Sequence, residues 1–128
     1  MSDTYCVRKC FEQPAENHGH PGSISRVVMG PDAHRDDRPA ALNSERLVIH
    51  TNEYEVGGVS GDGHSHGNQE QAYYILEGEM EATVGEETFQ VGPGDSVFLP
   101  RGGFHKHRNL GDKPLKFLFI SAMVQENS

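Results

Sequence analysis

The feature that most constrains the fold of this chain is a succession of short β-strand patterns separated by turn-forming residues. In each run, β-branched and aromatic residues predominate, and glycine, proline, asparagine or aspartate fills the gaps between runs. No long segment has the 3.6-residue period of an amphipathic helix. The pattern predicts an all-β domain, an antiparallel sandwich or barrel. The expected strands lie at residues 23–29, 46–56, 72–76, 79–84, 88–91, 96–99, 104–108 and 115–123.

Length and composition predict one domain with a thin or partly polar interior. The chain has 128 residues, of which 34% are hydrophobic, and a single domain commonly spans about 100–150 residues. We expect residues 46–122 to form the barrel. Residues 1–45 would add strands and a loop that pack on the barrel or on a dimer partner, and residues 123–128 would form a frayed tail. Within the loop at 30–45, a short helical turn is a candidate at 40–42.

The charge and hydropathy of the chain disfavour several classes of function. A net charge of −8 argues against binding to nucleic acid or to anionic lipid, both of which need a basic surface. The longest apolar run, at residues 115–124, is shorter than the about 20 residues of a membrane span. The N-terminus has no apolar signal segment, which predicts a cytoplasmic protein.

Four N-terminal residues are weaker candidates for chemistry. Cys6 and Cys10 are too few for a disulfide framework. Their spacing suits half of a metal or redox site, and the alternative is two ordinary half-buried residues. His18 and His20 lie in a Pro/Gly-rich stretch without a strand partner, and we interpret them as loop residues.

Two other His-x-His pairs carry the strongest chemical signal. They are His64 with His66 and His105 with His107, each within or beside an expected strand and bounded by glycine turns. On an extended chain, residues i and i+2 project from the same face, so each pair could bind one ion. Several imidazoles together with an oxygen ligand suit a first-row transition metal. A single such pair is more often surface decoration, but two are harder to dismiss.

The second of these segments resembles the second motif of the cupin superfamily. That motif runs Gly, five residues, Pro-x-Gly, two residues, His, three residues, Asn. The chain matches it at every position, with Gly94, Pro100, Gly102, His105 and Asn109. The resemblance covers roughly residues 46–122 and implies a small antiparallel β-barrel of the jelly-roll type.

The first cupin motif is also present, with one departure. It runs His-x-His, three or four residues, Glu, six residues, Gly, and His64, His66 and Gly78 fit it. Separated from Gly78 by six residues, the chain has Gln71 where the family has Glu. The neighbouring Glu70 would point to the opposite face of the strand, so only one of the two can enter the barrel. The motif spacing favours Gln71, and the resemblance implies one divalent metal ion (Mn, Fe, Ni, Cu or Zn) on four ligands: His64, His66, Gln71 and His105.

The neutral glutamine bears on the expected chemistry. Three imidazoles and an amide oxygen leave the charge of the ion uncompensated, which favours Lewis-acid activity and disfavours a higher oxidation state. We therefore expect a metal-dependent enzyme, a lyase or isomerase acting on a small hydroxy acid, keto acid or sugar acid. The alternatives are a metal-dependent dioxygenase and a non-catalytic ligand-binding or sensor protein.

Two further residues are candidates for catalysis. His107 should point inward with His105 and could act as an acid or base, since its pKa naturally lies near working pH. The alternative is a hydrogen-bonded core histidine. Tyr73 shares the inward face with Gln71 and could donate to substrate, although filling the barrel is the commoner use of such a residue.

The remaining expectations concern substrate and partner. Arg46 and His50 share one face of a strand and could bind a substrate carboxylate, or belong to the solvated face. His34 and Arg35, in the long loop, could belong to a lid. We expect a homodimer in which the strand at residues 5–11 extends a sheet.

Overall fold

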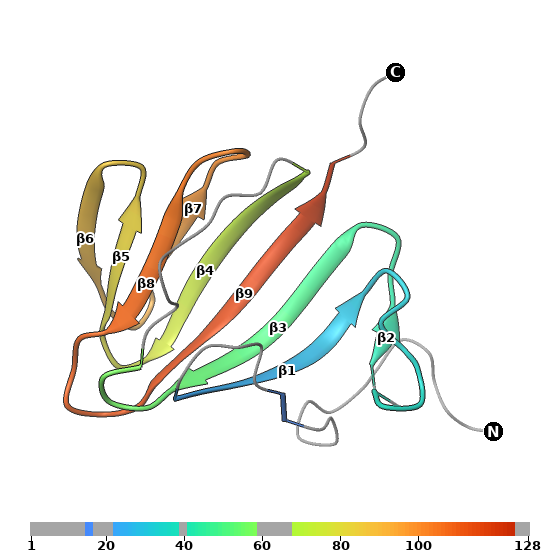
Figure 1. Ribbon diagram of the computed structural model, residues 1–128, viewed down its shortest axis with the longest axis horizontal. Coiled ribbons are helices and arrows are strands. Elements are labelled where there is room, and N and C mark those ends of the chain that lie inside the picture. The colour runs from blue at the N-terminus through green and yellow to red at the C-terminus, as the bar shows by residue number, and fades with distance from the viewer. Residues whose placement is uncertain (1–14, 17–21, 39–40, 59–67, 125–128) are drawn as a thin grey trace.

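The computed structural model describes residues 15–16, 22–38, 41–58 and 68–124, and every regular element within them is a β-strand (Figure 1). This confirms the expected all-β fold, and each strand expected at residues 23–123 is found. In chain order the strands are β1 (Ser23–Gly30), β2 (Leu42–Asn43), β3 (Leu47–Tyr54), β4 (Gln69–Glu77), β5 (Met80–Val84), β6 (Glu87–Val91), β7 (Ser96–Leu99), β8 (His105–Asn109) and β9 (Leu115–Met123).

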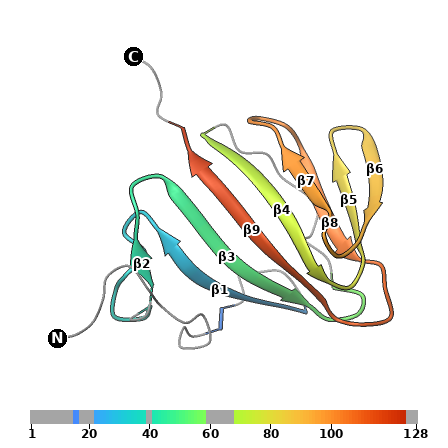
Figure 2. The same ribbon diagram turned by 180° about the vertical axis from the view of Figure 1, so that it is seen from behind.

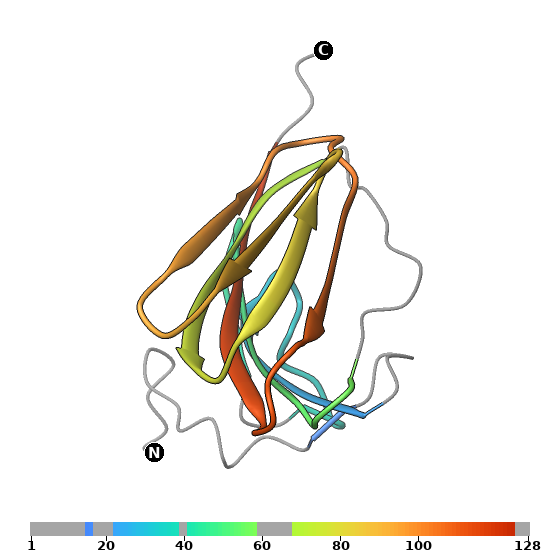
Figure 3. The same cartoon turned by 90° about the vertical axis from the view of Figure 1, so that its left-hand side faces the viewer.

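The strands form two sheets that make a jelly-roll sandwich. The large sheet has the order β2-β1-β3-β9-β4-β7, and the small sheet has the order β6-β5-β8. Figure 2 shows the long strands β1, β3, β9 and β4 side by side, and Figure 3 gives the sandwich in side view. From β4 onward the chain passes repeatedly between the sheets, so β4 and β8, which carry the candidate site residues, belong to different sheets.

The helical turn considered for residues 40–42 is wrong where the structure describes it. Leu42 and Asn43 form β2, which pairs in parallel with Met29 and Gly30 at the end of β1. The tertiary pairing with β1 thus overrides a weak local preference. No helix long and apolar enough to cross a membrane occurs in the described part of the chain.

The core lies between the two sheets and follows the period-2 alternation of the strands. In β8, burial alternates from residue to residue, and the buried positions are polar. Imidazole, amide and hydroxyl groups therefore share the interior with apolar side chains, which confirms the partly polar interior expected from the composition. The apolar core consists of Tyr54, Tyr73, Ile75, Met80, Ala82, Val97, Leu99, Leu115 and Phe117.

Candidate functional site

The candidate site lies on the inner face of the sandwich, where β4 faces β8. Gln71 and Tyr73 of β4 are 5% and 1% exposed, and His105 and His107 of β8 are 2% and 9% exposed. Within each strand the two residues are separated by one position, so the strand alternation brings both side chains to the same face. Residues 34 positions apart in the chain thus meet in the interior.

The Gln71 amide is held so that its oxygen faces His105. The amide Nε2 donates to Ser121 Oγ at 3.4 Å and to Gln69 Oε1 at 3.0 Å. The amide Oε1 lies 3.1 Å from His105 Nε2. Because an amide oxygen only accepts, His105 donates from Nε2 in this arrangement. The hydrogen bonds of the amide nitrogen therefore hold the Gln71 amide with its oxygen toward the His105 ring.

Glu70 points the other way. It is exposed, as is Tyr74 on the same side of β4, whereas Gln71 and Ile75 are buried. The expectation that Gln71, and not Glu70, enters the interior is therefore confirmed. That Gln71 binds a metal stays a prediction.

Tyr73 links the two buried histidines. Its hydroxyl lies 2.8 Å from His107 Nδ1 and 3.3 Å from His105 Nδ1. Burial raises the pKa of Tyr73, with a smaller contribution from the nearby Tyr54 phenol, so the phenol stays protonated at neutral pH. The hydroxyl is thus a neutral group that can both donate and accept.

His107 is enclosed by aromatic rings. The ring centroids of Tyr73, Tyr54 and Phe117 lie 4.8, 4.9 and 5.2 Å from that of His107, each in an edge-on arrangement. The inward orientation expected for His107 is therefore confirmed, and its role in catalysis stays a prediction.

The arrangement fits part of a metal centre. An amide oxygen and an imidazole nitrogen are both donors that first-row divalent ions accept. Gln71 Oε1 and His105 Nε2 lie 3.1 Å apart, at hydrogen-bond distance, and the two would hold one ion once Nε2 has released its proton. The other two expected ligands, His64 and His66, lie outside the described residues. Among the residues that are described, no three His, Cys, Asp or Glu side chains are grouped so as to bind an ion.

The two residues expected to bind substrate lie at different depths. His50 is partly buried on the inner face of β3, and its ring lies 5.9 Å from Phe119, which lies 5.6 Å from Tyr73. In the sheet, His50, Phe119 and Tyr73 occupy one row across β3, β9 and β4. Arg46 is exposed just before β3, where its carbonyl accepts from Met123 N. The structure therefore brings His50 close to the site, and Arg46 only to its end of the sheet.

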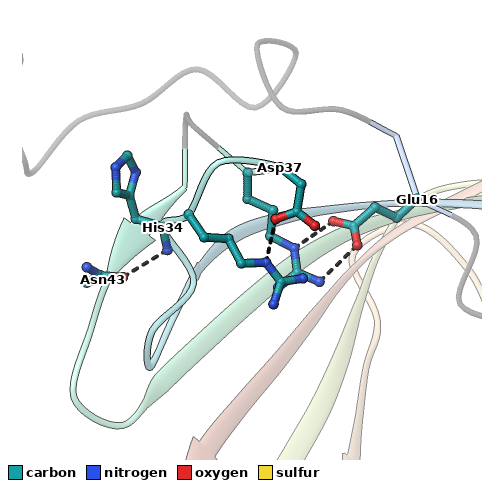
Figure 4. Close-up of polar contacts among 6 residues, drawn as sticks. Glu16, His34, Asp37 and Asn43 are labelled. Atoms are coloured by element: carbon teal, nitrogen blue, oxygen red, sulfur yellow. Dashed lines mark hydrogen bonds and ion pairs between the residues drawn. The ribbon is translucent and has the colours of Figure 1, made fainter.

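The loop considered as a lid lies beside β2, at the edge of the large sheet. His34 N donates to Asn43 Oδ1 at 2.9 Å, and the Arg35 guanidinium pairs with Asp37 (Figure 4). In the same loop the Arg38 guanidinium makes a bidentate ion pair with the Glu16 carboxylate (Figure 4). The contacts of His34 and Arg35 stay within residues 30–45, whereas Arg38 ties the loop to Glu16, and the lid stays a prediction. Cys6, Cys10, His18, His20 and the strand expected at residues 5–11 lie outside the described residues.

Sequence reasoning missed one residue of the site, Ser121. It is 2% exposed and accepts a hydrogen bond from Gln71 Nε2. In β9 it follows Leu115, Phe117 and Phe119 at the same two-residue spacing. The sequence does contain a signal for Ser121, because it stands at an inward-facing position of an otherwise apolar strand. A buried hydroxyl at such a position needs a hydrogen-bond partner.

Part of the chain is similar in sequence to a known protein family and to a curated protein. A family model described as a cupin domain matches residues 50–121. The uncharacterized protein MJ1618 of Methanocaldococcus jannaschii is 43% identical over 58 residues, which are 45% of this chain and 46% of that protein. The chain thus matches less than half the length of this curated relative.

Solved structures resemble the whole fold. KdgF from Halomonas sp. has a TM-score of 0.73 and 17% identity, covering 93% of this chain and 94% of that one. A predicted oxalate decarboxylase from Thermotoga maritima has a TM-score of 0.71 and 21% identity, covering 92% of this chain and 99% of that one. At these identities the likeness concerns the fold.

Proposed function

Since this chain belongs to the cupin domain family, we propose that it is a metal-dependent enzyme, a lyase or isomerase acting on a small hydroxy acid, keto acid or sugar acid. The observation that carries the proposal is the pairing of a neutral amide oxygen, Gln71 Oε1, with His105 Nε2 on the buried inner face. His64, His66, Gln71 and His105 would hold the ion. It would supply Lewis acidity toward a carbonyl or hydroxyl oxygen of the substrate.

The neutral donor set supports chemistry without a change of oxidation state. An amide and three imidazoles bring no negative charge to a divalent ion, whereas a glutamate in the same place would bring one. With neutral ligands the metal ion keeps more of its positive charge, so it would polarise a bound substrate oxygen more strongly. The same ligands would make a higher oxidation state of the ion less stable. The exposed Glu70 does not restore that charge, because it lies on the opposite face of β4.

Tyr73 and the two histidines can move a proton along a short relay. In the structure His105 donates from Nε2 to Gln71, so the neutral ring accepts from Tyr73 at Nδ1. With an ion held at Nε2, His105 would carry its proton on Nδ1 and donate it to the Tyr73 oxygen. Tyr73 would then donate to His107 Nδ1, 2.8 Å away, with the ring proton of His107 on Nε2. In this proposal Tyr73 takes the substrate proton on its oxygen as it passes its own proton to His107 Nδ1, which leaves His107 as an imidazolium, and the reverse transfer returns the proton.

Two residues outside the buried cluster are proposed to bind substrate. His50 is joined to Tyr73 through the Phe119 ring and could donate to a substrate oxygen. Arg46, exposed before β3, could pair with a substrate carboxylate. A small acid recognised in this way is compatible with the description of the Thermotoga protein as a predicted oxalate decarboxylase.

The proposal is tested by assaying hydroxy acids, keto acids and sugar acids with and without dioxygen. Metal-loaded protein is incubated with each compound in air and under argon, products are identified by NMR, and dioxygen is followed with an electrode. We expect equal turnover in both atmospheres and no dioxygen uptake. Turnover that requires dioxygen would identify the dioxygenase instead, and binding without turnover would identify a sensor.

A matched pair of variants separates the metal chemistry from the fold. Gln71→Glu adds a negative charge to the ligand set and should lower turnover about tenfold or more while the metal stays bound. Glu70→Gln, the reverse change on the exposed side of β4, should leave turnover unchanged. Equal activity of the Gln71→Glu protein and the wild type would contradict the role given to the neutral amide.

A further inference from the structure

Gln71 has four nearest neighbours on the inner face of the large sheet, and two of them accept its amide hydrogens. Ser121 of β9 and Leu99 of β7 lie opposite Gln71 in the neighbouring strands. Gln69 and Tyr73 lie two positions away along β4, on the same face. The amide Nε2 donates to Gln69 Oε1 and to Ser121 Oγ. The two hydrogens of the amide group thus have one acceptor each.

With both hydrogens bonded in this way, the oxygen is the end of the Gln71 amide that faces the small sheet. Oε1 lies 3.1 Å from His105 Nε2 across the interior. In the reverse orientation the NH₂ group would face His105. Because an amide NH₂ group only donates hydrogen bonds, it offers no ligand atom to a metal ion. The orientation of the amide therefore decides whether Gln71 can bind an ion at all.

The two acceptors lie at different depths. Ser121 is 2% exposed, so water cannot replace its hydroxyl next to the buried Gln71 amide. Gln69 is partly exposed at the start of β4, where water can replace its amide oxygen. The hydrogen bond to Ser121 is the longer one, at 3.4 Å against 3.0 Å. Its loss is nevertheless the more costly, because it leaves a buried N–H unsatisfied.

We propose that Ser121 and Gln69 are positioning residues, which hold the Gln71 amide with its oxygen toward the site and thereby raise its affinity for a metal ion. The inference rests on the proposed function, since it concerns Gln71 as a metal ligand. Neither residue contacts the ion or the substrate, and both act through Gln71. Groups that orient a metal ligand typically contribute about 10-fold to 100-fold to metal affinity. Ser121, the more deeply buried of the two, should contribute more than Gln69.

A second buried serine offers a matched control. Ser25 of β1 is 4% exposed, and its hydroxyl has no hydrogen-bond partner among the described residues. In the order of the large sheet, β3 and β9 separate β1 from β4. Ser25→Ala therefore removes a buried hydroxyl, as Ser121→Ala does, but leaves the surroundings of Gln71 intact.

The positioning is tested first in the metal-free full chain, by NMR of the Gln71 side-chain amide. Its two proton resonances are assigned by their absence from the Gln71→Ala protein. In the wild type both hydrogens should exchange slowly with water, because both are bonded in the interior. Ser121→Ala should shift these resonances and speed their exchange about tenfold or more, whereas Ser25→Ala should change neither.

The effect on the ion is measured by titrating the same metal-free proteins with Mn²⁺. Ser121→Ala should raise the dissociation constant about tenfold or more, and Gln69→Met, which keeps the length of the side chain without its acceptor, should raise it less. Ser121→Thr retains the hydroxyl and should restore an affinity close to that of the wild type. Ser25→Ala should bind as the wild type does. In the Co²⁺-loaded proteins, the visible absorption spectrum should change for Ser121→Ala alone of the two serine-to-alanine variants.

Circular dichroism and thermal unfolding of the metal-free proteins establish whether each variant is folded. Should Ser121→Ala fail to fold, Ser121→Cys takes its place, since a thiol is a weaker acceptor of similar shape. Unchanged Mn²⁺ affinity in the folded variant, an equal loss in Ser25→Ala, or a Ser121→Thr protein that binds as weakly as Ser121→Ala would overturn the inference and leave the proposed metal site standing. A wild type that binds no Mn²⁺ would overturn both, because the contacts of Gln71 would then serve the fold only.

Discussion

The buried polar side chains of the described residues are amides, hydroxyls and imidazoles, with no carboxylate among them. Burying a neutral polar group costs little once it is hydrogen-bonded, whereas burying a charge costs far more. Asn109 follows this rule, since Nδ2 donates to Tyr54 O at 3.1 Å and to Lys113 O at 2.8 Å, and Oδ1 accepts from Gly111 N at 2.9 Å. A glutamine at position 71 is consistent with an interior built from neutral groups.

One prediction at this scale concerns Tyr54, whose pKa burial raises above its usual value of about 10. Above pH 10 the unfolded chain releases this proton while the folded chain keeps it, so the free energy of unfolding falls as pH rises. Tyr54→Phe should reduce that slope by about 1 kcal/mol per pH unit between pH 10 and 11, where the unfolded phenol goes from about half to about nine-tenths ionised. Urea unfolding at pH 9, 10 and 11 measures it. If the free energy of unfolding fell equally with pH in both proteins, the pKa of Tyr54 would be the same in the folded and the unfolded chain.

The sequence predicts which side chains face inward, because side chains alternate between the two faces of a strand. Once one residue is known to face inward, the residues two positions away face inward as well. Gln71, Tyr73 and His107 follow this rule. The hydrogen bond from Gln71 to Ser121 could not be predicted. It depends on which strand lies next to β4, and residues 50 positions apart carry no local signal of their pairing.

At the scale of elements, the turn between β4 and β5 depends on Gly78. Its φ is +87°, and a Cβ at this position would lie 2.7 Å from Pro114 O and 2.9 Å from Leu115 Cα. Gly94, between β6 and β7, has nearly the same φ of +88° but no atom within 4 Å of such a Cβ. Alanine substitutions at these two glycines therefore distinguish the cost of a positive φ from the cost of a steric clash.

Gly78→Ala and Gly94→Ala form a matched pair. Gly94→Ala should cost about 1 kcal/mol, from the positive φ alone. Gly78→Ala should cost about 3 kcal/mol or more, because backbone atoms at the start of β9 must also move. Free energies of unfolding in urea check both values. Equal losses would mean that the chain at Pro114 and Leu115 moves aside at no cost.

Strand positions and turns were predictable because glycine and proline interrupt a simple alternation, but the order of strands in the sheets was not. β9 pairs with both β3 and β4, which are far from it in the sequence. β2 was missed because two residues are too few to show a period, and only the pairing with β1 defines them.

At the scale of the whole molecule, the two faces of the large sheet have different uses. The inner face carries Gln71 and Tyr73 against the small sheet, and the outer face exposes large apolar side chains such as Tyr74 and Phe98. This division explains how a chain with 34% hydrophobic residues both encloses a polar site and exposes apolar side chains. The hydrophobic residues are shared between a small core and an external surface.

Gln71, and not Glu70, is proposed to complete a metal site with His105. Elemental analysis of the purified protein gives its metal content, and Mn²⁺ titration of the metal-free form gives the affinity. We predict about one ion per wild-type chain, an affinity about tenfold or more lower for Gln71→Ala, and unchanged binding for Glu70→Ala. Unchanged binding in Gln71→Ala with loss in Glu70→Ala, or a wild type that binds no metal, would contradict the account.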